Sequence, residues 1–156
     1  MDWKNICGKC EKHGCCCGVE PVYVTRQEEE TIKKATRIKN LTINNYLRKK
    51  NKKCIFLKNG FCGIQSIKPL DCKAWPIVFW SDGGDGEISY FLDLDCVEAL
   101  NLSKKDIARL KRVVEQQIKK WTKEDLYKYD ICAYWKPEKI NKNYKKDRAY
   151  PFGVGK

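Results

Sequence analysis

Residues 54–62 read CIFLKNGFC, two short apolar runs separated by an Asn-Gly pair. The Asn-Gly pair favours a tight turn, because both residues readily adopt the positive φ that a two-residue hairpin loop requires. The stretch therefore predicts a β-hairpin over residues 54–65, with Cys54 and Cys62 near its two sides.

More β structure is predicted on the C-terminal side of this hairpin. The runs 77–80 and 88–94 are apolar and rich in residues that favour strands. The sequence SDGGDG joins them, and its composition is typical of a turn. A small antiparallel sheet is therefore expected after the hairpin.

Helices are predicted on either side of these strands. Thr25 and Glu28 form a capping box in front of a helix over 27–38, and a second short helix is predicted over 42–50. A long amphipathic helix is predicted to start after Ser103 and to pack in the core through an apolar stripe. The stripe consists of Ile107, Leu110, Val114, Ile118 and Trp121.

These elements predict an α+β fold class: a small antiparallel sheet with a cysteine-rich metal-binding loop and flanking helices, including one long C-terminal amphipathic helix. A chain of 156 residues has the length of one domain. We therefore expect a single cysteine-cluster metal-binding domain over 1–135 and a basic C-terminal tail over 136–156. Residues 1–20 have no helical or strand periodicity, so their order is expected to come from metal coordination.

The chain contains ten cysteines, far more than packing requires. They are Cys7, Cys10, Cys15, Cys16, Cys17, Cys54, Cys62, Cys72, Cys96 and Cys132. Thiolates are soft, anionic ligands that suit zinc and iron. Disulfides are the weaker interpretation, because they need an oxidising compartment and the N-terminal residues lack the apolar segment of a secretory signal.

Cys7 and Cys10 form a CxxC motif, a spacing that lets two thiolates of one tight turn bind the same metal. The same spacing occurs in thioredoxin-like redox sites, but those follow a strand, and no strand is predicted before Cys7. The number of thiols strengthens the metal interpretation. Eight of them would fill two four-coordinate centres, or one centre with residues to spare.

The stretch 54–76 resembles the second half of the CxxCxxCC cysteine-cluster family, a family described as zinc- or iron-chelating. The usual family form is close to CxFLxxGxCxIYxxRPxxCRxFP, and this chain reads CIFLKNGFCGIQSIKPLDCKAWP. The first half of the family pattern has a CxxC, a CC pair and a helix opened by a Thr-x-x-acidic box, which Thr25 and Glu28 fit. The resemblance spans about residues 7–96 and implies that cysteines from both halves bind the metal.

We predict eight metal ligands: Cys7, Cys10, Cys16, Cys17, Cys54, Cys62, Cys72 and Cys96. Three consecutive side chains do not readily converge on one metal, so at least one of the cysteines 15–17 is expected not to be a ligand, and which pair binds is open. His13, which lies inside an insertion relative to the family, could complete a Cys3His site or be an exposed loop residue. Cys96 fits a ligand or a core residue equally well, and Cys132 is expected to be a packed thiol.

The net charge is +12, from 32 Lys and Arg against 20 Asp and Glu. Such a balance attracts an acidic protein or a nucleic acid, and the outer face of the long helix and the tail are the basic surfaces considered for either partner. No membrane partner is expected, because the longest apolar stretch, 74–80, is far below the roughly 20 residues that cross a bilayer. A cytoplasmic location is therefore expected.

The sequence thus predicts a metal-binding protein whose cysteine cluster holds zinc or an iron–sulfur cluster, in a structural or a redox role. Two alternatives stay open: a zinc-stabilised nucleic-acid-binding module, and an iron–sulfur enzyme. One histidine and no paired carboxylates give no support to hydrolytic catalysis.

Overall fold

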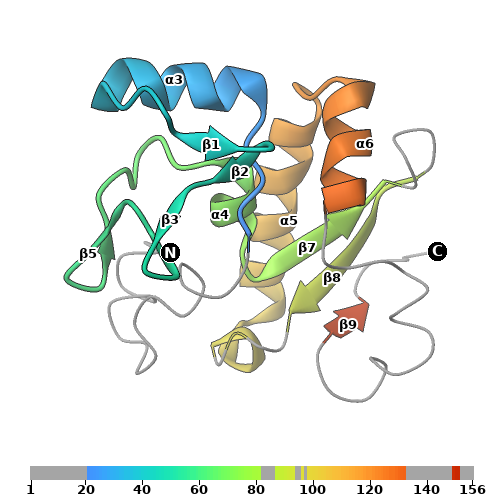
Figure 1. Ribbon diagram of the computed structural model, residues 1–156. Helices are drawn as coiled ribbons and strands as arrows, with labels where there is room; N and C mark the ends of the chain where they lie inside the picture. Colours follow the sequence, from blue (N-terminus) through green and yellow to red (C-terminus); the bar gives the residue numbers. More distant parts are fainter. Residues whose placement is uncertain (1–20, 82–86, 94–95, 97, 133–148, 152–156) are drawn as a thin grey trace. The chain divides into compact units, whose positions relative to one another are not determined.

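The computed structural model describes residues 21–81, 87–93, 96, 98–132 and 149–151, which form an α+β fold (Figure 1). The predicted fold class is therefore confirmed. The chain divides into two compact units, residues 1–73 and 74–156. The expected division into a domain and a basic tail stays a prediction. Within the described residues, no helix is both long and apolar enough to cross a membrane.

Helix α3 (Arg26–Thr36) opens the described part of the first unit, and it begins where the sequence predicts a capping box. The Glu28 N–H donates to Thr25 Oγ1 at 3.2 Å, while the Thr25 N–H donates to the Glu28 carboxylate at 3.0 Å. Two N–H groups that would lack a partner at the helix start are thereby satisfied. At the other end, Arg37 takes a left-handed conformation and its N–H donates to the Lys33 carbonyl, which ends the helix.

Three two-stranded antiparallel hairpins follow α3. They pair β1 (Thr42–Ile43) with β2 (Tyr46–Leu47), β3 (Lys49–Lys50) with β4 (Lys53–Cys54), and β5 (Leu57–Lys58) with β6 (Phe61–Cys62). Each loop has two residues with positive φ, namely Asn44 and Asn45, Asn51 and Lys52, and Asn59 and Gly60. Two such residues give the loop the twist that matches paired strands.

Two predictions for this region need correction. The helix predicted over 42–50 is wrong, because two consecutive asparagines adopt left-handed conformations there and close a hairpin in place of a helical turn. The predicted Asn-Gly turn is confirmed, but Cys54 lies on the preceding hairpin, opposite Lys49. Only Cys62 belongs to the hairpin that the Asn-Gly turn closes, where it lies opposite Leu57.

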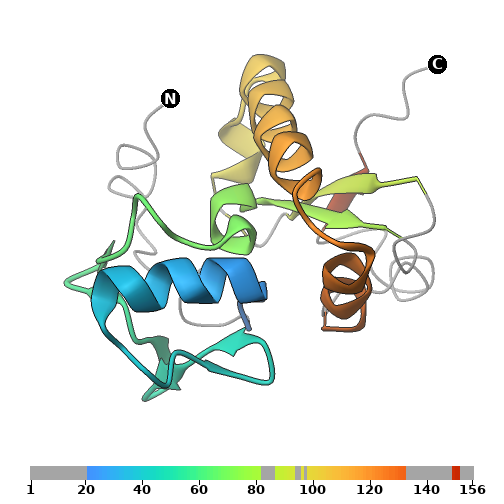
Figure 2. The ribbon, with the colours of Figure 1, turned by 90° about the horizontal axis from the view of Figure 1, so that it is seen from above.

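The core of the first unit joins α3 to the hairpins. It consists of Val22, Val24, Ile32, Leu41, Leu47, Phe56 and Ile64. Residues 22–24 run beside β2, since the Leu47 N–H donates to the Val22 carbonyl and the Val24 N–H to the Asn45 carbonyl, both at 2.9 Å. From above, α3 lies alongside the hairpin segment (Figure 2).

The second unit contains a three-stranded antiparallel sheet in the order β7-β8-β9. Strands β7 (Ile77–Trp80) and β8 (Ser89–Asp93) confirm the two predicted runs, and β9 (Ala149–Pro151) adds a strand that the sequence does not predict. The predicted turn between β7 and β8 falls at 82–86, outside the described residues.

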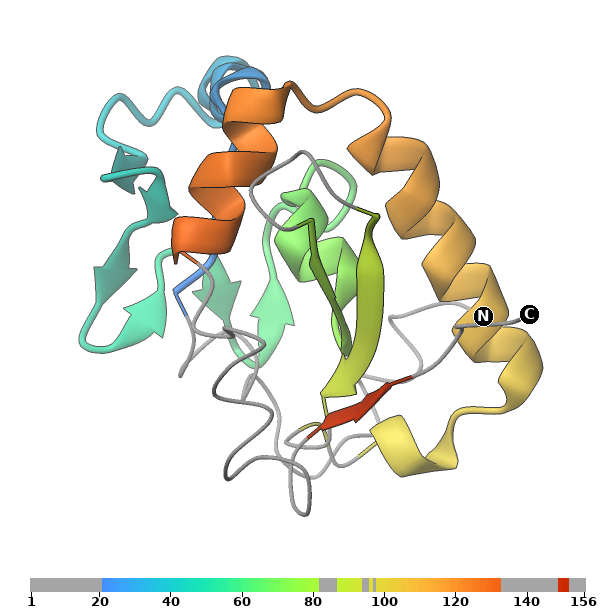
Figure 3. The ribbon, with the colours of Figure 1, turned by 90° about the vertical axis from the view of Figure 1, so that its right-hand side faces the viewer.

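Two helices and a short 3-10 helix, η1 (Ala99–Asn101), complete the second unit. Helix α5 (Lys104–Ile118) packs on β7, as Figure 3 shows, and starts after Ser103, whose hydroxyl accepts the N–H of Asp106. Its predicted stripe is buried at Leu110, Val114 and Ile118, while Ile107 and Trp121 are partly exposed.

Helix α6 (Lys123–Cys132) is anchored to β7 by aromatic and polar contacts. The Tyr129 ring stacks on Phe79 with ring centroids 4.2 Å apart, and Trp121 meets Phe79 edge-on at 5.7 Å. The Ser81 hydroxyl and N–H both donate to the buried Asp130 carboxylate, at 2.6 and 3.2 Å. The polar groups at the end of β7 are thus satisfied without water.

Candidate metal centre

Cys54, Cys62 and Cys72 all pack against the apolar core of the first unit. They come from three successive elements, β4, β6 and α4 (Leu70–Ala74). All three are free thiols of intermediate exposure, and all three pack against the same apolar cluster. Residues separated by up to 18 positions in the sequence therefore contact one apolar cluster.

Strand alternation explains why two of these thiols face the core. In a two-stranded hairpin, a residue and its cross-strand partner share a face, and the next pair lies on the opposite face. The half-buried pairs contain Cys54 and Cys62, whereas the neighbouring pairs, Lys50 with Lys53 and Lys58 with Phe61, are exposed. Each hairpin thus presents a thiol inward.

The Cys54 thiol is affected by burial and by hydrogen-bond donors that act in opposite directions. Burial raises the pKa of Cys54 above its usual value, while hydrogen bonds from the backbone of Phe56 and Leu57 and the charge of Lys49 act in the opposite direction. Hydrogen bonds to sulfur are one of the means by which proteins tune thiolate-bound metals. The segment after Cys54 therefore already supplies donors that a metal-bound sulfur would use.

The Cys72 thiol is more strongly desolvated. Burial raises the pKa of Cys72 well above its usual value, and negative charges on Asp71, Cys54 and Cys62 act in the same direction, against Lys68. The thiols are thus close enough for the ionisation of one to oppose that of another. A bound cation would reverse this balance, because it stabilises several thiolates at once.

Two carboxylates clamp α4, which carries Cys72, to the segment that leads into α3. The Leu70 N–H donates to the Glu28 carboxylate at 2.7 Å, and the Tyr23 N–H donates to the Asp71 carboxylate at 2.9 Å. The carboxylate of Glu28 thus accepts from the backbone of α4, and the carboxylate of Asp71 accepts from the backbone that precedes α3. Hydrogen bonds to charged groups are the stronger class, so this clamp fixes α4 firmly.

The clamp has a consequence for the two halves of the predicted site. Tyr23 follows the N-terminal cysteine run by only six positions after Cys17. The clamp therefore holds the residues that directly follow this run in the sequence next to the helix of Cys72. Sequence reasoning assigned Glu28 only to the helix cap and missed Asp71, although its position directly before Cys72 was a usable signal.

We expect Glu28→Ala to destabilise the protein by about 2–3 kcal/mol, because it removes the carboxylate that accepts the Thr25 N–H in the capping box and the Leu70 N–H of α4. Glu28→Gln keeps an acceptor oxygen and is expected to cost clearly less. Glu30→Ala is the matched control on the same helix, because Glu30 is exposed and pairs with Arg26. Urea denaturation measures all three, and equal stability of Glu28→Ala and Glu30→Ala would contradict the clamp.

The other predicted ligands belong to the second unit or lie outside the described residues. Cys96 is buried in the second unit, where its carbonyl accepts the Ala99 N–H at 2.8 Å. Cys7, Cys10, Cys16 and Cys17, together with Cys15 and His13, lie outside the described residues. In the part of the chain that is described, no three His, Cys, Asp or Glu side chains are gathered closely enough to hold a metal. The three central thiols fit zinc or iron by chemistry, but a complete centre needs further ligands.

Comparison with known proteins gives one match. The CxxCxxCC family model, described as a putative zinc- or iron-chelating domain, matches residues 6–97. This range includes every cysteine except Cys132. No curated protein and no solved structure matches the chain.

Proposed function

The chain belongs to the CxxCxxCC family, whose model covers more than half of it, and from that premise we propose that it binds zinc or an iron–sulfur cluster through its cysteines. The N-terminal run contributes four of the ligands, the hairpins and α4 contribute three, and Cys96 is the eighth. The proposed ligands are Cys7, Cys10, Cys16, Cys17, Cys54, Cys62, Cys72 and Cys96.

The gathering of Cys54, Cys62 and Cys72 on one core cluster is the observation that supports this proposal most. Burial raises the pKa of Cys54 and raises that of Cys72 well above its usual value, so these two thiols are costly to ionise without a cation. A metal that binds all three as thiolates compensates this cost. Metal binding and folding of the first unit would then be linked.

Both metal forms are chemically compatible with this ligand set. Structural zinc takes four ligands in a tetrahedron and accepts four thiolates, and iron–sulfur clusters are held by four cysteines as well. The contiguous cysteines and the surplus of thiols favour the cluster. In either form the metal would tie the N-terminal run to the hairpins, and a cluster would add redox capacity. An enzymatic role would require a coordination position that no cysteine fills.

Anaerobic purification followed by metal analysis, acid-labile sulfide analysis and a visible spectrum tests the proposal. Iron with matching sulfide and visible absorption would identify a cluster, and zinc without sulfide would identify a zinc site. We expect Cys54→Ser to lose most of the metal and Cys132→Ser to retain it, since Cys132 lies outside the family match. A protein that carries neither metal nor sulfide would refute the proposal.

A further inference from the structure

The positive charge of this protein is concentrated in one segment. Residues 31–70 contain eleven Lys and Arg and no Asp or Glu. The basic residues are Lys33, Lys34, Arg37, Lys39, Arg48, Lys49, Lys50, Lys52, Lys53, Lys58 and Lys68. The rest of the chain has 21 Lys and Arg against 20 Asp and Glu, so this segment accounts for nearly all of the net charge of +12.

Part of this charge lies on the solvent-facing side of the hairpins. Strand alternation directs the cysteines of β4 and β6 toward the core, so the alternate residues face solvent. Lys50 and Lys53 are an exposed cross-strand pair on the β3–β4 hairpin, and Lys58 and Phe61 are an exposed pair on the β5–β6 hairpin. We call Lys50, Lys52, Lys53, Lys58 and Phe61 the hairpin basic face.

Two lysines of the β3–β4 hairpin lie in an unfavourable cross-strand arrangement. Lys50 lies directly opposite Lys53, and like charges in this position destabilise a strand pair. Lys52 adopts the left-handed conformation that the two-residue loop requires, with a φ of 62°. A cross-strand pair of like charges is a departure from local preference of the kind expected at functional sites.

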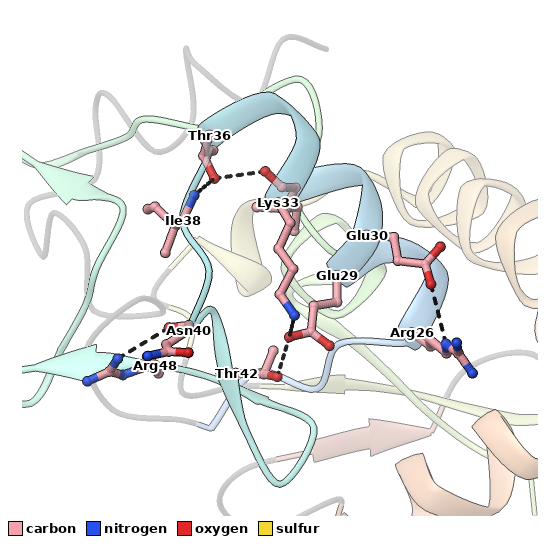
Figure 4. Close-up of polar contacts among 10 residues, drawn as sticks. Arg26, Glu29, Glu30, Lys33, Thr36, Ile38, Asn40, Thr42 and Arg48 are labelled. Carbon is pink, nitrogen blue, oxygen red and sulfur yellow. Dashed lines mark hydrogen bonds and ion pairs between the residues drawn. The ribbon is translucent and has the colours of Figure 1, made fainter.

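The acidic side chains of α3 already have partners (Figure 4). Glu30 pairs with Arg26 at 3.3 Å, and Glu29 accepts from Lys33 at 2.8 Å and from the Thr42 hydroxyl at 2.7 Å. Burial acts to raise the pKa of Glu29, but these hydrogen bonds outweigh it and lower the pKa below its usual value. The carboxylates of Glu29 and Glu30 thus pair with groups of α3 and β1.

Phe61 adds an aromatic surface to this charge. Its side chain is 57% exposed, which is unusual for phenylalanine in a folded protein. The cross-strand register puts Lys58 directly opposite it on the same face. An exposed ring next to cations is the arrangement by which proteins bind single-stranded nucleic acid, with a base stacked on the ring and phosphates on the lysines.

We propose that the hairpin basic face binds single-stranded nucleic acid. The lysines of β3–β4 contact phosphates, and Phe61 stacks on an unpaired base beside Lys58. In a duplex the bases are already stacked on each other and offer no free face to the Phe61 ring. A single strand is therefore the better ligand. This activity goes beyond metal binding and does not depend on which metal the cysteines hold.

Fluorescence anisotropy of the full, metal-loaded chain with a labelled oligouridine of about 20 nucleotides tests the proposal, since single-strand sites span several nucleotides. The log of the affinity should fall by about 0.7 per phosphate contact for each tenfold rise in salt. Lys50→Ser, Lys52→Ser and Lys53→Ser combined should reduce this slope by about 2. The same triple variant should weaken binding on the order of a hundredfold near 0.1 M salt.

Lys104→Ser, Lys105→Ser and Lys120→Ser combined form the matched control. These lysines are exposed on and after α5, and the variant has the same change in net charge. It should keep the affinity and the salt slope. Phe61→Leu should weaken binding roughly fivefold or more without changing the slope, because it removes stacking only. Tyr127→Leu, at a tyrosine 53% exposed on α6, should have no effect.

Three results would overturn the proposal. The first is an equal loss in both triple variants, which would mean that net charge alone attracts the oligonucleotide. The second is binding to vesicles of anionic phospholipid without binding to the oligonucleotide. The third is no binding at low salt by a chain that carries its full metal content. Metal analysis and circular dichroism of every variant separate a binding defect from a folding defect.

Discussion

Cys72→Ser is expected to abolish metal binding and to destabilise the first unit more than any other single substitution. Cys72 lies in α4, packs against the apolar core and is held in place by the Glu28 and Asp71 carboxylates. No other residue of this short helix can replace its sulfur. A serine hydroxyl is a hard, neutral group and does not substitute for a thiolate on zinc or iron.

The size of the effect follows from the link between metal and folding. Structural zinc contributes an apparent 10–16 kcal/mol or so in small metal-dependent domains, so even partial loss of coordination exceeds the effect of an ordinary core substitution. We expect less than about a tenth of the wild-type metal content. We also expect a Tm close to that of the wild-type protein treated with a chelator.

Two comparisons make this prediction specific. Cys72→Ala keeps the position apolar and should lose the metal as completely as Cys72→Ser, because the missing ligand and not the hydroxyl is the cause. Cys132→Ser should behave as the wild type. A Cys72→Ser protein with full metal content would show that Cys72 is a packed thiol and not a ligand.

Phe79→Ala is expected to lower the free energy of unfolding by about 3–5 kcal/mol. Phe79 lies in the middle of β7 and is only 2% exposed. Its ring stacks on Tyr129 with an interplanar angle of 9° and meets Trp121 at 63°. Truncation removes the burial of a large side chain and two ring contacts, and it leaves a cavity where β7, α6 and Trp121 meet.

Guanidinium denaturation of the metal-loaded protein measures this loss. Phe79→Leu fills most of the volume without the ring contacts and should cost roughly half as much or less. Tyr127→Ala is the matched surface control, since Tyr127 is a largely exposed aromatic residue of α6 and should change stability by less than about 0.5 kcal/mol. A loss below about 1 kcal/mol for Phe79→Ala would show that the aromatic cluster adds little.

Elements that depend on neighbouring residues could be predicted from the sequence. The capping box of Thr25 and Glu28 and the cap at Ser103 are bonds between a side chain and a backbone group three residues away. The turn at Asn59 and Gly60 reflects the φ preference of the two residues themselves. The same preference of Asn44 and Asn45 was overlooked, and the helix predicted over 42–50 was therefore wrong.

The sequence by itself determined the cysteine pattern, the family and the starts of helices α3 and α5, because spacing along the chain and local hydrogen bonds are enough for these. Only the tertiary structure decided which hairpin carries Cys54. It also decided that the thiols of these strands face the core while the neighbouring lysines face solvent. It also decided the clamp on α4, whose hydrogen bonds join residues 42 and 48 positions apart. Such contacts exist only after the core has formed, since no local preference brings distant backbone groups to a buried carboxylate.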